Sequence, residues 1–148
     1  MVKDTNFDFE IVKLSFADEY HDIQADSTIT SSLEYIDFYD KSYDESYLEF
    51  ALDLNQRYLA KYPKDEIAKV NVYLIKLKQG HKLSEDEQSD LYNIQVRAEM
   101  NNEQTICFAC EVLLKNKTKA KRIFATLPGE EKEEIMEFPI YRFYQNLE

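Results

Sequence analysis

The chain has 148 residues and a formal net charge of −11, from 18 basic and 29 acidic residues. This length suits one domain with its own core, and two cysteines are too few for a disulfide framework. The acidic balance disfavours direct nucleic-acid binding, and no run approaches the roughly 18 apolar residues of a membrane helix. Gly80 and Gly129 are the only glycines, too few for phosphate-binding loops or the tight turns of all-β folds. We therefore expect a single all-α domain over residues 1–148, without a cofactor or metal.

The negative charge is concentrated in the first third of the chain. Residues 1–50 hold 13 acidic and 3 basic residues, a net charge of −10, and 10 of the 20 aromatic residues. The other 98 residues carry a net charge of only −1. We expect an acidic, aromatic-rich N-terminal segment over residues 1–45, joined to stacked helical hairpins over residues 46–148.

Residues 7–20 fit two kinds of secondary structure. Phe7, Phe9 and Ile11 alternate as in a short strand or hairpin, whereas Phe9, Val12 and Phe16 fit one face of a helix. Both interpretations stay open.

Two helices are predicted before the first proline. The first has apolar residues at steps of 4, 3 and 3, namely Ile29, Leu33, Ile36 and Tyr39. The second begins near Ser46 and ends before Pro63. Its apolar stripe consists of Tyr47, Ala51, Leu54, Tyr58 and Tyr62.

The next two helices have clear start or stop signals. One opens at Lys64–Asp65 and ends at Gly80, a frequent C-terminal residue of helices. Its stripe is Ile67, Val70, Leu74 and Leu77. The other follows Ser84, which forms a capping box with Glu87. Its buried face is Leu91, Ile94 and Ala98.

Three further segments complete the predicted stack. Asn101 or Asn102 is expected to cap a helix, and the turn at Asn116–Lys117 leads into another that ends at Pro128–Gly129. The apolar positions of these two helices are Ile106, Ala109, Cys110, Leu113, Leu114, Ala120, Ile123, Phe124 and Leu127. A short helix over Glu130–Phe138 and an aromatic tail over Ile140–Tyr144 follow. Short connections between the helices indicate antiparallel neighbours.

Residues 102–128 resemble a degenerate tetratricopeptide hairpin. Ala120 and Phe124 match that family's second-helix alanine and the aromatic four residues later, and Asn116 matches its turn. Phe108 departs from the family, which has a small residue there. A 36-residue shift also aligns the apolar positions of 70–80 with those of 106–116, near the roughly 34-residue unit of such repeats. The resemblance implies a short α-solenoid that binds a protein or peptide.

Two clusters have spacings found in metal or redox sites. Cys107 and Cys110 form a C-x-x-C pair, but inside an apolar helical stripe, so we expect them in the core. Asp18, Asp22 and Asp26 could offer oxygen ligands to a hard cation in a metal-dependent enzyme, yet the glycine and glutamate of an EF-hand are missing. We interpret these aspartates as a solvated acidic surface.

The segment over residues 35–44 alternates tyrosines with aspartates. Tyrosine gives broad contact area at low entropic cost, and aspartates attract a basic partner. The alternative is an ordinary amphipathic helix and loop. The candidate partner-binding residues are Tyr35, Asp37, Tyr39, Asp40, Tyr43 and Asp44.

No arrangement of side chains in the sequence indicates a catalytic triad or general acid–base chemistry. The leading hypothesis is therefore a non-enzymatic protein–protein interaction module that is cytoplasmic and does not act on membranes. The alternative is a small acidic inhibitor or immunity-type protein that mimics nucleic acid and blocks a basic nuclease or toxin. The excess of Lys (14) over Arg (4) indicates an AT-rich bacterial or phage genome.

Overall fold

The computed structural model describes residues 31–148. The strand or helix considered for residues 7–20 and the Asp18–Asp26 cluster lie outside this range, as does the beginning of the helix expected from Ile29.

The described residues form helices joined by short connections, and no strand occurs among them. This confirms the predicted all-α fold. A helix covers residues 31–42. After it come α2 (Glu45–Lys61), α3 (Glu66–Lys78), α4 (Glu85–Met100), α5 (Gln104–Leu113), α6 (Lys117–Thr126), α7 (Gly129–Met136) and α8 (Pro139–Gln145).

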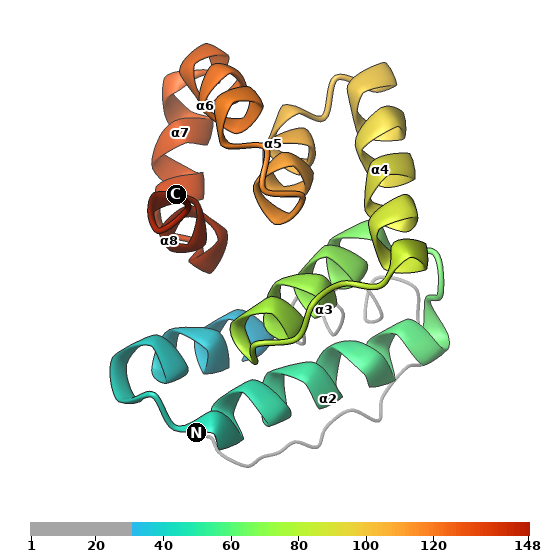
Figure 1. Cartoon of the computed structure of the whole chain (residues 1–148), viewed down its shortest axis with the longest axis vertical. Helices are drawn as coiled ribbons and strands as arrows, with labels where there is room; N and C mark the ends of the chain where they lie inside the picture. The colour runs from blue at the N-terminus through green and yellow to red at the C-terminus, as the bar shows by residue number, and fades with distance from the viewer. Residues whose placement is uncertain (1–30) are drawn as a thin grey trace, which may run out of the picture.

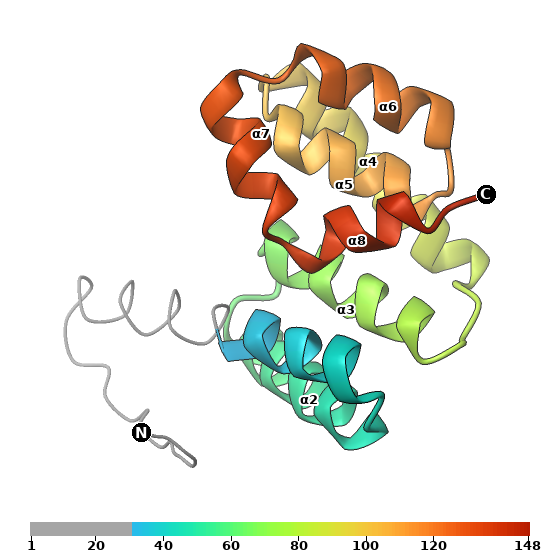
Figure 2. The same cartoon turned by 90° about the vertical axis from the view of Figure 1, so that its left-hand side faces the viewer.

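Neighbouring helices pack against one another in chain order. The helix over 31–42 lies beside α2, and α2 packs on α3 (Figure 1). In the C-terminal part, α4 and α6 flank α5 on two sides. After α7 the chain turns back, so that α8 lies between α5 and the helices of the N-terminal part (Figure 2).

Helix α5 is the centre of the core. It packs against α3, α4, α6 and α8, and all seven residues from Cys107 to Leu113 are buried. A helix that is apolar on nearly every side needs neighbours on every side. Phe108 is completely buried, with its ring centroid 5.7 Å from that of Phe124 and 5.1 Å from that of Tyr144. One apolar cluster connects α5 to Ile36 on the helix over 31–42.

Local signals set most of the helix ends. Ser84 and Glu87 form the predicted capping box, in which Ser84 Oγ accepts from the Glu87 amide at 3.1 Å and Glu87 Oε1 accepts from the Ser84 amide at 2.9 Å. Asp65 caps α3 by accepting from the Ala68 amide at 2.9 Å. Gly80 has a φ of +88°, a conformation that residues with a side chain rarely adopt, and it follows the end of α3 as predicted.

Two predictions in the C-terminal part were wrong in detail. Neither Asn101 nor Asn102 caps α5, because the chain runs on to Glu103, which precedes the helix and makes no side-chain cap. The residues expected as an aromatic tail form α8, which has Pro139 in its first turn, where a proline fits because its missing amide has no helical partner there. The helix predicted over Glu130–Phe138 is α7, which ends at Met136.

The capping box also makes stability depend on pH. A hydrogen bond from Lys76 and another from the Ser84 amide lower the pKa of Glu87. A carboxylate with a lowered folded pKa contributes stability above its unfolded pKa of about 4.3 and loses it as the pH falls through the folded pKa. We expect Glu87→Gln to cost about 1 kcal/mol at pH 7 and almost nothing at pH 3, measured by urea unfolding.

The matched control for this prediction is Glu85→Gln, in the same first turn of α4, where the side chain is exposed. The control should change stability by less than about 0.5 kcal/mol at either pH. An equal cost of Glu87→Gln at pH 7 and pH 3 would contradict the role assigned to the ionised carboxylate.

Candidate functional site

The residues predicted to bind a partner lie at the end of the helix over 31–42 and in the turn to α2. All three carboxylates of this set have partners inside the chain. Asp40 Oδ1 accepts from Lys78 Nζ and its Oδ2 from Arg142 Nε, both at 2.7 Å. Asp37 accepts from the Nη2 atom of the same arginine. Asp44 caps α2 by accepting from the amide of Ser46 at 3.0 Å, and the Ser46 hydrogen bonds lower its pKa.

The tyrosines of that segment separate into buried and exposed members. Tyr39 packs against the core, and its hydroxyl donates to Glu45 Oε2 at 3.3 Å. Burial, together with the charge of Glu45, raises the pKa of Tyr39. Tyr43 is 76% exposed and Tyr35 is half-buried. Most of the predicted set therefore stabilises the fold, and its binding role stays a prediction.

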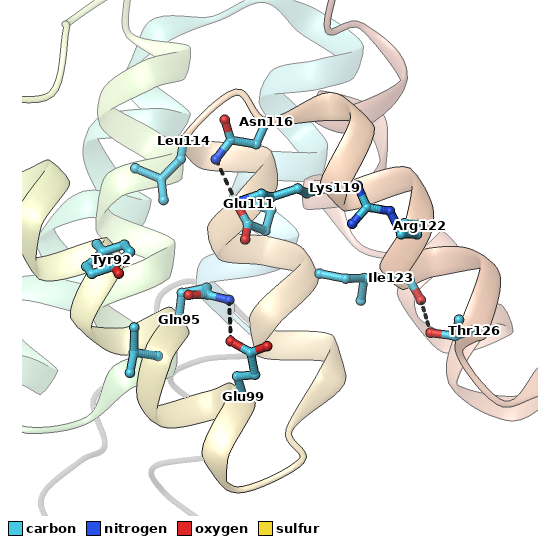
Figure 3. Close-up of a pocket in the computed structure, with 11 residues that line it drawn as sticks. Tyr92, Gln95, Glu99, Glu111, Leu114, Asn116, Lys119, Arg122, Ile123 and Thr126 are labelled. Carbon is cyan, nitrogen blue, oxygen red and sulfur yellow. Dashed lines mark hydrogen bonds between the residues drawn. The ribbon is translucent and has the colours of Figure 1, made fainter.

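A groove that the sequence analysis did not identify lies among the helices α4, α5 and α6. It has a volume of about 480 Å³, with α5 as its floor and α4 and α6 as its walls (Figure 3). The wall residues recur at helical steps, so each helix presents one face to the groove. Helix α4 contributes Tyr92, Gln95, Val96 and Glu99, and α6 contributes Lys119, Arg122, Ile123 and Thr126. The floor consists of Glu111 in α5, and of Leu114 and Asn116 in the turn between α5 and α6.

The two walls differ in charge. Lys119 and Arg122 are exposed on α6, and neither pairs with a carboxylate among residues 31–148. Glu99 stands on α4, where it accepts from Gln95 Nε2 at 3.4 Å. Between the walls Glu111 is only 5% exposed, and its Oε1 atom accepts from Asn116 Nδ2 at 2.8 Å. Figure 3 shows this glutamate between the α4 and α6 side chains.

The groove continues along α4 into a second, more open hollow of about 750 Å³. The two hollows share Tyr92, Leu114 and Asn116. Helix α4 has 16 residues, a length of about 24 Å, which equals about seven residues of extended chain. The concave surface is therefore long enough for a peptide segment.

Two signals for the groove were present in the sequence. Residues 115–122 include five basic side chains and no acidic one, an unusual cluster in an acidic chain. On α4, Tyr92, Gln95 and Glu99 share a face beside the buried stripe. What the sequence could not indicate is that α4 and α6 stand on either side of α5.

The cysteine pair is confirmed as part of the core. Cys107 and Cys110 are both buried in α5, and burial with nearby carboxylates raises the pKa of Cys107 to about 11 and that of Cys110 to about 12. A nucleophilic or metal-binding thiol requires a thiolate, which burial in apolar surroundings disfavours. Within residues 31–148 no three histidine, cysteine, aspartate or glutamate side chains converge as metal ligands.

This burial predicts slow alkylation of both cysteines. At pH 8 about one thiol in a thousand is ionised if its pKa is near 11, whereas about one in four is ionised in an unfolded cysteine. Because the thiolate is the reactive form, iodoacetamide should react roughly a hundredfold more slowly with the native chain than with the unfolded one. Mass spectrometry of samples with and without 8 M urea, about the level that unfolds a domain of this size, measures the ratio. Similar rates in the two samples would show that the thiols are accessible.

Comparisons with protein-family models, with curated proteins and with solved structures find no match to this chain. None of the helices within residues 31–148 combines the length and the apolar character needed to cross a bilayer. Function is therefore inferred from the groove and from the surface of the described residues.

Proposed function

We propose that this chain is a non-enzymatic protein–protein interaction module, in which tetratricopeptide-like helical hairpins hold a segment of a protein partner in the groove between α4 and α6. The observation that carries the proposal is the groove itself, walled by one face of each helix and continued along α4. We place the module in the cytoplasm of a bacterium or a phage-infected cell.

The lining of the groove favours a peptide over a small molecule. Small-molecule pockets are mostly apolar, whereas eight of the eleven lining residues here are charged or amide- or hydroxyl-bearing. Val96, Leu114 and Ile123 provide apolar contact, as in the mixed surfaces of non-obligate protein interfaces. The two cations of α6 face Glu99 and Glu111, so a bound segment would have one orientation, with a carboxylate towards α6.

The alternative of an acidic inhibitor receives less support. It requires the aspartates of residues 37–44 to reach the cations of a basic partner. Asp37 and Asp40 instead pair with Arg142 and Lys78, and Asp44 caps a helix. Releasing them to a partner would cost these internal interactions, so the groove is the better candidate.

The test compares two double variants with equal changes in charge. Lys119→Glu with Arg122→Glu alters the groove wall, whereas Lys115→Glu with Lys121→Glu alters exposed cations of the same segment that do not line the groove. Tagged full-length chains are used for affinity purification from the native host, and each recovered protein is then purified and titrated. We expect the groove variant to weaken binding of the partner by about tenfold or more and the control by less than about twofold.

Equal losses in both variants would show a non-specific charge effect and contradict the groove as the site. Unchanged binding in both variants would also contradict the groove as the binding site. Turnover of any substrate by the purified chain would contradict the non-enzymatic part of the proposal. Circular dichroism of each variant checks that its helices are intact.

A further inference from the structure

Four aromatic rings form a continuous cluster on the surface of the first hairpin, made by the helix over 31–42 and α2. We call this cluster the aromatic patch; it consists of Tyr35, Phe38, Tyr47 and Phe50. The ring centroids of Tyr35 lie 6.3 Å from Phe38, 6.2 Å from Tyr47 and 5.6 Å from Phe50. Those of Phe38 and Tyr47 are 5.5 Å apart.

Tyr35 packs partly against the core, but the packing of the hairpin does not account for the exposed rings of the patch. The inner face of the hairpin is formed by Ile36 and Leu48, which are fully buried. Phe38 and Phe50 point elsewhere and keep 47% and 53% of their surface exposed. Each helix thus has a second apolar face. Adjoining exposed aromatic rings are costly in water and mark interaction surfaces more often than single exposed apolar residues do.

The charges around the patch are negative. Glu34 and Glu49 are exposed, and neither forms an ion pair within residues 31–148. Burial raises the pKa of Tyr35, and the charge of Glu34 raises it further. Over residues 31–61, which span both helices of the hairpin, the chain has seven acidic side chains and three basic ones, of which Arg57 pairs with Asp53.

This charge pattern selects among possible occupants of the patch. Residues 1–30 carry seven acidic and two basic side chains, so they have the same sign as the patch and would be repelled. Two copies of the chain, patch to patch, would bring Glu34 and Glu49 towards the same carboxylates of the other copy. A segment with apolar and cationic side chains would not be repelled by the patch. Its ammonium or guanidinium groups would be attracted by the aromatic rings and would pair with the carboxylates.

We propose that the aromatic patch is a second docking surface, which binds a basic amphipathic helix of a partner protein. The apolar face of that helix packs on Phe38 and Phe50, and its lysines or arginines lie over the ring faces and beside Glu34 and Glu49. This deepens the proposed function by naming the chemistry of a partner, but it involves none of the residues that line the groove.

The absence of tryptophan from the chain allows a direct binding assay. The probe is a synthetic amphipathic helix of about 18 residues, five turns, built from leucine and lysine with one tryptophan. A second peptide with glutamate in place of lysine is the counter-probe. The full-length chain is titrated into each peptide, and the tryptophan fluorescence is followed at two salt concentrations.

We expect the lysine peptide to bind and the glutamate peptide not to bind. Phe38→Ser with Phe50→Ser should raise the Kd about tenfold or more, since aromatic anchors carry much of the energy of such interfaces. Glu34→Gln with Glu49→Gln should raise the Kd by roughly threefold to fivefold and reduce its dependence on salt. These two conservative changes at exposed sites test the proposal even if the serine variant is poorly folded.

The control variant is Ile67→Ser with Met100→Ser, which alters exposed apolar side chains on α3 and α4. It should leave the Kd within about twofold of the parent chain. Equal loss in this control, equal binding of both peptides, or an unchanged Kd in the patch and glutamine variants would each overturn the proposal. So would self-association, measured by light scattering, that disappears in the Phe38→Ser and Phe50→Ser variant.

The groove variant with Lys119→Glu and Arg122→Glu separates the two sites. It should bind the lysine peptide as the parent chain does. Loss of peptide binding in this variant would assign the peptide to the groove and contradict the aromatic patch, without contradicting the groove as an interaction site.

Discussion

Replacing Phe108 by alanine is expected to lower the free energy of unfolding by about 3–5 kcal/mol, the usual cost of removing a fully buried phenyl group. The side chain is completely buried at the centre of α5, and its ring contacts those of Phe124 and Tyr144. Because Phe124 belongs to α6 and Tyr144 to α8, the cavity would open where three helices meet. For a chain of about 150 residues this corresponds to a fall in Tm of roughly 10–15 °C.

Calorimetry and urea unfolding of the full-length chain measure this effect. Phe50→Ala is the matched control, because the same group is removed from a position that is 53% exposed. That variant should lose about 1 kcal/mol or less. Similar losses in the two variants would contradict the central position of α5 in the core.

The helices could be predicted from the sequence because their signals are local. A proline at 63 and a glycine at 80 end two of them, and the pairing of Ser84 with Glu87 begins a third. Each signal acts within about one helical turn, so the chain nearby contains all the information that is needed. The reliance on local signals also explains why Asn101 or Asn102 was wrongly predicted to cap α5. Both residues are good caps, but which residue caps a helix depends on where the preceding connection ends.

The groove required information that local patterns do not contain. The spacing of Lys119, Arg122 and Ile123 shows that they share a face of α6. It does not show that this face lies across from Tyr92 and Glu99 on α4, with α5 between them. That arrangement results from how α5 buries nearly its whole circumference. A helix with so many apolar sides has several possible sets of neighbours.

The partners of the charged side chains could not be predicted from local patterns either. The aspartates of residues 37–44 suggested a surface for a basic partner, yet two of them bind cations that lie far along the chain. Arg142 is 105 residues from Asp37 and 102 from Asp40. No periodicity connects residues at such separations. Asp37 and Asp40 are therefore engaged within the fold, whereas the nearby rings of Phe38 and Phe50 stay about half exposed.

Replacing Arg142 by methionine is expected to lower the free energy of unfolding by about 2 kcal/mol, because it leaves Asp37 without its ion pair and Asp40 with Lys78 alone. Methionine keeps the apolar stem that packs beneath the charge. About a third of the arginine surface is exposed, so solvent screening reduces the cost below the roughly 3–5 kcal/mol of a fully buried pair. The ion pairs join α8 to the helix over 31–42, and amide hydrogen exchange in both helices should accelerate together.

The control for this prediction is Arg57→Met, which breaks an exposed pair with Asp53 within one turn of α2. Pairs of this kind contribute about 0.5 kcal/mol or less. A double-mutant cycle with Asp37→Asn should give a coupling of about 1 kcal/mol to Arg142→Met at low salt, and less at 1 M salt, where the Debye length is about 3 Å. Equal losses for the two arginine variants would mean that α8 is held by apolar contacts alone. A coupling near zero would remove Asp37 from the network, and the aspartate would then be free to contact a partner, as the sequence first suggested.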